Sequence, residues 1–182
     1  TIAEIAAAKD IDAVVICTPT DTHADLIEAF AKAGKAIFCE KPIDLSLDRV
    51  KACLSVVRAT KATLMVGFNR RFDPHFAAVK AEIAKGSVGD VEMVTITSRD
   101  PGAPPLDYIA RSGGIFRDMT IHDFDMARFL LAEEPVEVYA VGSSLVDPGI
   151  GAAGDVDTAA ACIGDQRGHE GKTGPRQRAE GG

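Results

Sequence analysis

Three short apolar runs, separated by helical stretches, place the strongest constraint on how the first third of this chain can fold. The runs cover residues 13–17, 36–39 and 63–67, and each is rich in aliphatic side chains. Such a run is typical of a strand that is buried on both faces of a parallel sheet. The stretches between the runs repeat apolar residues at helical spacing. Because strands that alternate with helices over short connections form right-handed parallel sheets, we predict an α/β domain over residues 1–67.

The pattern changes after the third apolar run, and residues 68–163 indicate part of an α+β domain. Residues 91–98 and 136–146 alternate between apolar and polar side chains, as strands do when one face of their sheet is covered. Helical periodicity covers residues 72–85 and about 116–131. We therefore expect the second domain to combine helices with a sheet of different construction from the first.

The two ends of the sequence carry expectations of their own. Thr1 already falls inside a helical pattern, so we expect further residues before it. Residues 164–182 are mostly glycine, charged and polar, and Ala179 is the one aliphatic residue among them. A segment of this composition lacks the apolar surface that a core needs. Since it follows abruptly on the strand pattern of residues 157–163, we expect either a frameshifted end or a natural disordered tail.

Composition argues against several classes of function. The formal net charge is −7, and the basic residues form no stripe with interleaved aromatic side chains, so we predict no nucleic-acid partner. The four cysteines have the spacing of neither a zinc site nor a redox pair, which predicts reduced thiols and no metal. No apolar run approaches the roughly 18–20 residues of a membrane helix. We expect a cytoplasmic protein without a membrane partner.

Polar residues follow the predicted strands, at the edge where a parallel sheet binds its ligands. Thr18-Pro19 follows the first strand, Glu40-Lys41 the second, and residues 68–71 the third. A helix that begins after Thr18 would direct free N–H groups toward this edge, although an ordinary capped turn explains the same residues. A partly desolvated Lys41 can donate a proton or a hydrogen bond. A surface ion pair is the alternative explanation for that lysine.

Asn69 and Arg70 stand where the chain passes from the first domain into the second. An amide and a guanidinium at such a crossover can bind the hydroxyl groups of a substrate. A salt bridge between the domains would explain Arg70 equally well, and the sequence leaves both explanations open.

Asp118, His122 and Asp125 are spaced so that one helix would carry all three on the same face. A carboxylate beside a histidine fixes the tautomer of the ring and raises its basicity. Alcohol oxidation needs such a base, because the hydroxyl proton must be taken as hydride leaves carbon. The alternative is a helix N-terminus, where acidic residues favour the helix dipole. That alternative explains Asp118 well and the apolar-flanked His122 less well.

Four motifs together resemble the Gfo/Idh/MocA oxidoreductases, most closely the myo-inositol 2-dehydrogenase branch. The resemblance runs from the first residue to about residue 163. Each motif is moderately specific, whereas their order and separation are strongly specific. The motifs are Cys-Thr-Pro-Thr-Asp-Thr-His at 17–23, Glu-Lys-Pro at 40–42, Gly-Phe-Asn-Arg-Arg-Phe-Asp at 67–73, and Gly-Gly-Ile-Phe-Arg-Asp-Met-Thr-Ile-His-Asp-Phe-Asp at 113–125.

The resemblance implies the C-terminal part of a Rossmann-type parallel sheet, followed by part of an α+β domain with an open, mostly antiparallel sheet. It implies NAD as the hydride carrier, with NADP as the alternative, and a homo-oligomer as the full-length protein. The expected reaction oxidises a secondary hydroxyl of a cyclic polyol, myo-inositol foremost, to a ketone. The family's roles fall on catalytic Lys41, Asp118 and His122, cofactor-binding Thr18, Pro19, His23, Glu40 and Lys41, and substrate-binding Asn69, Arg70 and Asp125.

The sequence departs from the family pattern in the region that holds the cofactor's pyrophosphate. The family's Gly-x-Gly-x-x-Gly loop belongs to the first strand of the sheet, and we expect no such loop anywhere in this chain. The residue that decides between binding of NAD and of NADP belongs to the same region.

Three alternative functions remain beside the polyol dehydrogenase. They are a sugar (aldose) dehydrogenase or sugar–sugar oxidoreductase on the same scaffold, a dinucleotide-binding regulator without turnover, and an inactive truncated product.

Overall fold

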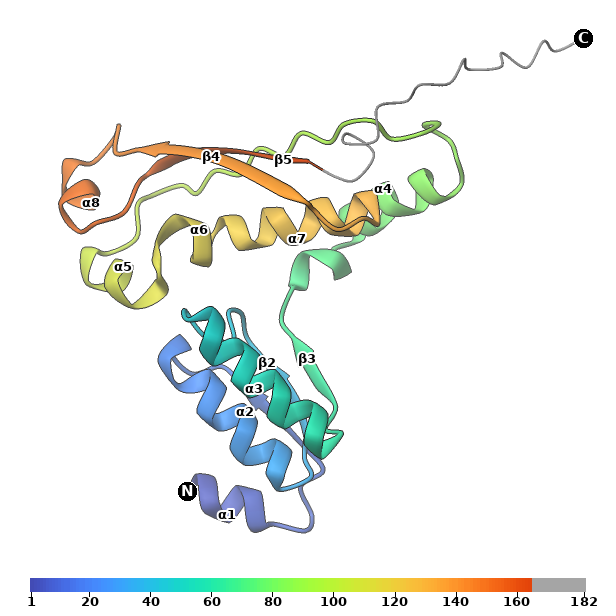
Figure 1. The fold of residues 1–182 in the computed structure, drawn as a ribbon, viewed down its shortest axis with the longest axis vertical. Coiled ribbons are helices and arrows are strands. Elements are labelled where there is room, and N and C mark those ends of the chain that lie inside the picture. The colour runs from blue at the N-terminus through green and yellow to red at the C-terminus, as the bar shows by residue number, and fades with distance from the viewer. Residues whose placement is uncertain (165–182) are drawn as a thin grey trace, which may run out of the picture.

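The computed structural model describes residues 1–164, which form two lobes of different architecture (Figure 1). The lower lobe in Figure 1 contains a three-stranded parallel sheet with its helices, and the upper lobe contains the remaining helices and a two-stranded antiparallel sheet. The chain passes from one lobe to the other after strand β3 (Figure 1). The predicted α/β fold class is confirmed. Most of the predicted tail lies outside the described residues.

The parallel sheet of the first lobe is built from β1 (Ala13–Ile16), β2 (Ala36–Cys39) and β3 (Leu64–Val66) in the order β1-β2-β3. Ile16 is in register with Cys39, and Cys39 with Val66. The strands therefore end level with one another. The polar residues that follow them are brought to one edge of the sheet, as predicted.

Helices α2 and α3 supply most of the packing in this lobe. The buried core draws on β1, β2, α2 and α3, and Ile27 and Cys39 are both fully inaccessible to solvent. Ser46 caps α3 by accepting the N–H of Arg49 through its hydroxyl, as its position before the helix predicts. The helical elements of this lobe are α1 (Ile2–Ala7), the 3₁₀ turn η1 (Thr20–Thr22), α2 (His23–Lys32) and α3 (Leu47–Thr60).

One prediction about the first strand is wrong. We expected residues 13–17 to be buried on both faces, whereas Val15 of β1 is 71% exposed and Met65 of β3 is 43% exposed. The core lies on the other face, where α2 and α3 pack, and Ala6 of α1 contacts the same core. In the described residues, helices cover one face of this sheet, so the aliphatic residues of the other face reach solvent.

The second lobe departs from the predicted order over residues 91–98 and at Met119, and it adds the unpredicted helical elements η2, α5 and α8. Strand β5 extends the predicted strand by one residue, Gly164, which we had assigned to the tail. No helix in the part of the chain that the structure describes has both the length and the apolarity to cross a membrane. The elements are η2 (Asn69–Phe72), α4 (Pro74–Ala84), α5 (Leu106–Ser112), α6 (Gly114–Asp118), α7 (Thr120–Leu131), β4 (Glu137–Ser143), α8 (Pro148–Ala152) and β5 (Thr158–Gly164).

The helix predicted over residues 116–131 is broken at Met119. The break separates α6 from α7, and Met119 has backbone angles of φ −99° and ψ −60°. The hydroxyl of Thr120 donates to the carbonyls of Ile115 and Phe116 at 3.1 and 3.2 Å. In a continuous helix, the backbone N–H of Thr120 would bond to the Phe116 carbonyl. A threonine hydroxyl that takes up this carbonyl competes with the helical ladder and favours a bend.

Residues 91–98, predicted as a strand, belong to neither sheet of the described residues. The predicted alternation is nevertheless present, because Val94, Ile96 and Ser98 are less exposed than the residues between them. Alternation reports which side of an extended chain is covered, whereas a strand also requires ladder hydrogen bonds to a neighbour. The sequence pattern indicated the first property and could not establish the second.

The spacing Gly-x-Gly-x-x-Gly does occur once, at residues 149–154, but in the wrong context for a dinucleotide loop. This segment forms α8 and the turn after it, between the antiparallel strands β4 and β5. A phosphate-binding loop must instead leave a parallel strand and open a helix that packs on the same sheet. We therefore assign no cofactor role to residues 149–154.

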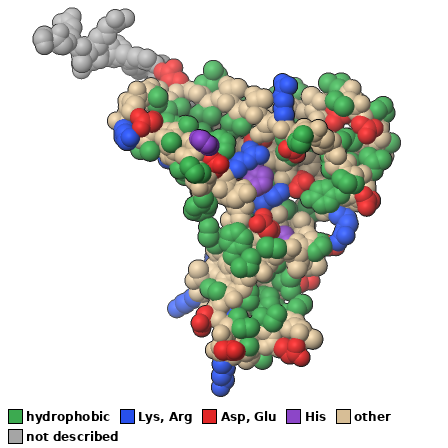
Figure 2. Space-filling model, turned by 180° about the vertical axis from the view of Figure 1, so that it is seen from behind, with side chains coloured by type: hydrophobic (Ala, Val, Ile, Leu, Met, Phe, Trp, Pro, Cys, Tyr) green, Lys and Arg blue, Asp and Glu red, His purple; other side chains and the backbone are tan. Residues whose placement is uncertain are grey.

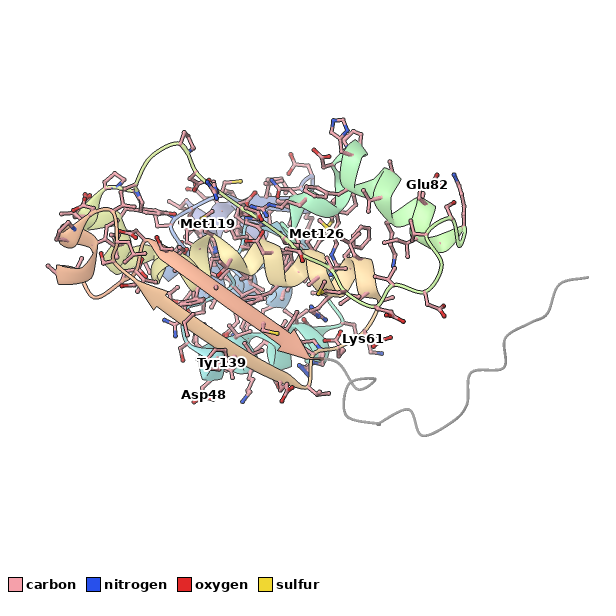
Figure 3. The ribbon with its side chains drawn as sticks, turned by 90° about the horizontal axis from the view of Figure 1, so that it is seen from above. Asp48, Lys61, Glu82, Met119, Met126 and Tyr139 are labelled. Carbon is pink, nitrogen blue, oxygen red and sulfur yellow. The ribbon has the colours of Figure 1, made fainter. Side chains whose placement is uncertain are left out.

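Strands β4 and β5 pair antiparallel from Glu137–Gly164 to Ser143–Thr158. Seen from above, the two strands run obliquely to α7, with Met119 and Met126 on the side of the helix and Tyr139 on β4 (Figure 3). Asp157 closes the far end of the hairpin by accepting backbone N–H groups from Leu145, Val146 and Asp147, each at 2.9 Å. These bonds hold the pKa of Asp157 well below its usual range.

Candidate active site

A pocket of about 420 Å³ lies where the carboxyl edge of the parallel sheet meets α5 and α6. Lys, Arg and His side chains gather near this meeting of the lobes (Figure 2). The pocket combines hydroxyl, thiol, imidazole, carboxylate and amine groups, which is the mixture that a polar ligand requires. Its lining residues are Cys17, Thr18, Pro19, Thr20, His23, Glu40, Lys41, Tyr108, Arg111, Ser112 and Asp118.

Lys41 and Asp118 form the central contact of this pocket. The ammonium of Lys41 donates to carboxylate oxygen Oδ1 of Asp118 at 2.8 Å and to its backbone carbonyl at 2.6 Å. The side chains are 15% and 30% exposed, so solvent screens this pair only in part. Lys41 follows β2 and Asp118 ends α6, and their contact therefore ties the two lobes together at the pocket.

Tyr108 joins this pair from α5. Its hydroxyl donates to the same Oδ1 of Asp118 at 3.3 Å. Burial and the Asp118 carboxylate raise the pKa of Tyr108, which keeps the hydroxyl protonated and able to donate. Sequence reasoning missed Tyr108 because α5 was not predicted and because one tyrosine in a proline-rich stretch carries no periodic signal.

His122 lies on α7 with its ring edge-on to Phe68, at 6.4 Å between ring centroids. Burial lowers the pKa of His122, and the positive charges of Lys41 and Arg70 lower it further. Nitrogen Nδ1 of the ring is buried and has no hydrogen-bond partner among the described residues. His122 lies outside the residues that line the pocket. A neutral imidazole with an uncommitted nitrogen can accept a proton from a ligand that reaches it.

The expected contact between Asp118 and His122 is not formed. The prediction relied on one continuous helix, and the break at Met119 removes the i, i+4 relation on which it depended. Oδ1 of Asp118 is directed to Lys41 and Tyr108 instead. The structure therefore joins Asp118 to the lysine, and it leaves His122 to be influenced by Asp118 only through charge.

Arg70 takes part in a second polar cluster, with Ser98 and Asp123. Its guanidinium donates to Oδ1 of Asp123 and to the Ser98 hydroxyl, and that hydroxyl donates to the same Oδ1 at 2.6 Å. Arg70 and Asp123 are 27% and 16% exposed, so ligands can still reach part of the cluster. Neither Ser98 nor Asp123 was predicted, because both contacts join segments that are distant in the sequence.

Asp125, predicted as a substrate contact, pairs with η2 in a seam that η2 and α4 form with α7. Both carboxylate oxygens accept from the guanidinium of Arg71, at 2.5 and 2.7 Å. Asp125 is 5% exposed, and Arg71 also lies over the ring of Phe129 at 5.4 Å. We call this cluster of Arg71, Asp125 and Phe129 the α7 seam. Both carboxylate oxygens of Asp125 accept hydrogen bonds within it.

Of the predicted cofactor-binding residues, four line the pocket with accessible groups, whereas His23 is buried beneath it. Thr18, Pro19, Glu40 and Lys41 line the pocket. His23 borders it as well but is 1% exposed, and both of its ring nitrogens already face backbone carbonyls at 2.7 Å. The ring has no free nitrogen with which to bind a cofactor directly.

Asn69 and Arg111 complete the placement of polar residues around the lobe boundary. Asn69 begins η2 and is exposed, outside the residues that line the pocket. Arg111, which was not predicted, donates from α5 to both carboxylate oxygens of Asp21 at 3.3 and 3.4 Å. This exposed pair is a second bridge between the lobes.

Comparison with known proteins identifies the family. Residues 1–68 match the family described as "Oxidoreductase family, NAD-binding Rossmann fold", and residues 76–171 match the "GFO/IDH/MocA C-terminal domain". The chain belongs to the Gfo/Idh/MocA family of oxidoreductases. This finding confirms the family that the four motifs indicated.

Individual relatives narrow the likeness within the family. The chain is 73% identical over 163 residues to the inositol 2-dehydrogenase of Rhizobium meliloti (strain 1021), covering 90% of this chain and 49% of that protein. A solved myo-inositol dehydrogenase from Corynebacterium glutamicum ATCC 13032 is 46% identical, with a TM-score of 0.86 over 92% of this chain and 50% of the other. A scyllo-inositol dehydrogenase from Lactobacillus casei with bound NAD(H) and scyllo-inositol is 32% identical, with a TM-score of 0.81 over 92% and 51% of the two chains. The chain thus spans about half the length of the relatives it matches.

Proposed function

We propose that this chain is the part of an NAD-dependent inositol dehydrogenase that carries its proton-transfer groups, and that the substrate is myo-inositol. The observation that carries the proposal is the Lys41–Asp118 contact at the carboxyl edge of a parallel sheet, together with a His122 whose pKa is lowered by burial and by the Lys41 charge. The names of close relatives support the choice of a cyclic polyol.

The residues at the sheet edge fit the nicotinamide end of a dinucleotide. The pocket lies beyond the carboxyl ends of parallel strands, where α/β sheets bind nucleotides. Thr18 and Thr20 offer hydroxyl groups there, and Glu40 offers a carboxylate that can accept from ribose hydroxyls. When bound, the nicotinamide would accept the hydride that leaves the substrate carbon.

His122 is the group we assign to take the hydroxyl proton. Its depressed pKa keeps the ring neutral near pH 7, and its buried Nδ1 is free of protein partners in the described structure. Deprotonating an alcohol as hydride leaves is general base catalysis, which contributes typically 10²–10⁴-fold to a rate. We propose Arg70 and Asn69 of η2, where the chain enters the second lobe, as contacts to the substrate hydroxyls that are not oxidised.

Lys41 is the group we assign to stabilise the developing alkoxide. Asp118 holds the ammonium through two hydrogen bonds, and this fixes the position of the positive charge before the substrate arrives. A fixed charge in a partly desolvated site costs little reorganisation when negative charge develops on oxygen. The same charge lowers the pKa of His122, so the lysine also keeps the proposed base neutral.

A substrate panel tests this proposal. Because the chain spans about half of its relatives, it replaces the aligned half of the Rhizobium meliloti relative in a hybrid protein. We expect NADH to form with myo-inositol and at a lower rate with scyllo-inositol. NADH formation with an aldose alone would favour the sugar dehydrogenase instead. NADH binding without turnover of any polyol or sugar would favour the regulator.

The hybrid needs a matched histidine control. His75 is exposed at the start of α4 and lies outside the pocket, so His75→Ala should leave the rate unchanged. His122→Ala should lower it by at least about a hundredfold. Equal rates in the two variants would remove His122 from the proposed mechanism.

A further inference from the structure

The ring of His23 connects the two loops that form the pocket. His23 begins α2, and its Nε2 lies 2.7 Å from the carbonyl oxygen of Thr18, which follows β1. Its Nδ1 lies 2.7 Å from the carbonyl oxygen of Pro42, which follows β2 and directly succeeds Lys41. The ring is 1% exposed, so water does not supply alternative partners. One side chain therefore spans the loop of the first strand and the loop of the second.

The two acceptors determine which form of the ring fits. A carbonyl oxygen accepts hydrogen bonds and cannot donate them. A neutral imidazole has one N–H and one lone pair, so it would direct the lone pair at one of the two carbonyls. The imidazolium has an N–H at both nitrogens and satisfies both contacts at the observed distance of 2.7 Å. Bonds of this length are typical of charge-assisted hydrogen bonds.

We infer that His23 is an imidazolium that clamps the Thr18 and Pro42 loops together and thereby positions Lys41 against Asp118. Burial of the ring, the positive end of the α2 dipole and the nearby Lys41 oppose this charge, and the two charge-assisted bonds offset them. The charged groups that share the pocket with His23 are the acids Glu40 and Asp118 and the bases Lys41 and Arg111. His23 is thus a positioning residue whose ring does not contact the ligand through nitrogen.

The protonation of the unaltered ring provides the decisive test. The full chain is labelled with ¹⁵N-histidine, and the one-bond N–H couplings of each ring are recorded at pH 7.5. Among the four histidines, the variants His75→Asn, His122→Asn and His169→Asn each remove one signal and leave that of His23. We expect protons on both ring nitrogens of His23. A ring nitrogen without a proton, as in a neutral or flipped ring, would overturn the inference.

The positioning of Lys41 is tested by competitive acetylation of the same chain followed by mass spectrometry. His23→Asn can bridge at most one of the two loops, so Lys41 should be acetylated at least about tenfold faster, as the loss of a hydrogen bond to a charged group predicts. Lys51 on α3 is 65% exposed and serves as the internal control, with an unchanged rate. An unchanged rate at Lys41 would refute the clamp. Neither readout requires turnover, so this inference and the proposed function can fail independently.

Discussion

The pocket and the α7 seam each hold an acid against a base, and they differ in what remains accessible. In the pocket, Lys41 and Asp118 are 15% and 30% exposed. In the seam, Arg71 is 36% exposed, whereas Asp125 is 5% exposed and has both of its oxygens bonded to Arg71. The same residue types can therefore serve chemistry in one place and stability in the other. Accessibility and uncommitted atoms, rather than residue type, decide which role applies.

The largest expected effect separates the two regions by activity. Lys41→Ala should lower kcat/KM of the hybrid protein at least about a hundredfold, because it removes the charge proposed to stabilise the alkoxide. Its urea midpoint should change little, because the Asp118 carboxylate that it leaves behind is 30% exposed and can be hydrated. Steady-state assays and urea denaturation measure the two quantities. A rate near that of the parent protein would remove Lys41 from the mechanism.

In the α7 seam we expect the opposite result, a loss of stability rather than a loss of rate. Asp125→Asn should lower the free energy of unfolding of the chain by about 1–3 kcal/mol, because it turns an amide NH₂ at a 5% exposed position toward the N–H donors of Arg71. Urea denaturation measures this change. Glu134→Gln provides the control, because Glu134 forms the same kind of bidentate contact with Arg128 on the exposed surface and should show no measurable loss. An Asp125→Asn protein of unchanged stability and reduced rate would instead make Asp125 the substrate contact predicted from the motif.

A smaller effect concerns the titration of His122. Lys41→Met should raise the pKa of His122, because the lysine charge is one cause of its depression. Arg111→Met is the control and should leave that pKa unchanged, since Arg111 is not among its causes. Titration of the ring followed by NMR measures both. Equal pKa values in the parent and the Lys41→Met chains would contradict the electrostatic coupling.

The same shift predicts a direction for stability. The pKa of His122 in the folded chain lies below the ordinary value of 6.5, so the unfolded chain binds the proton more readily. The contribution of this residue is absent above about pH 6.5 and destabilises the fold as the pH falls below that value. Replacing Lys41 should therefore reduce the acid sensitivity that His122 contributes.

The smallest effect is expected at the second bridge between the lobes. The side chains of Arg111 and Asp21 are 60% and 62% exposed, and guanidinium nitrogen Nη2 lies 3.3 Å from carboxylate oxygen Oδ1. Arg111→Gln should lower the free energy of unfolding by no more than about 1 kcal/mol, and salt should remove even that difference. A loss comparable with that of Asp125→Asn would show that solvent screening does not distinguish the two regions.

Sequence reasoning located the sheet edge well because strand ends need only local signals. Apolar runs identified all three parallel strands, and parallel pairing then brought Thr18 and Lys41 to one edge. The partners of the acids could not be found in the same way. Asp123 and Asp125 are two residues apart on α7, and their pairing with Arg70 and Arg71 depends on how η2 packs against that helix.

The break at Met119 shows the same limit at a smaller scale. Periodicity over residues 116–131 fits one helix or two collinear helices equally well. A single threonine hydroxyl bonded to two carbonyls accompanies the break, and no pattern in the sequence reports such a bond in advance. Because the helix breaks there, Asp118 forms its ion pair with Lys41 and makes no contact with His122.

The central claim is that these residues support hydride transfer from a polyol carbon. The most direct test uses myo-inositol deuterated at the carbon that is oxidised, with NAD and the hybrid protein, and measures deuterium in the reduced cofactor by mass spectrometry. We expect one deuterium per reduced cofactor, and at least about a hundredfold less labelled product from Lys41→Ala. Reduced cofactor without deuterium, or no reduced cofactor at all, would contradict it.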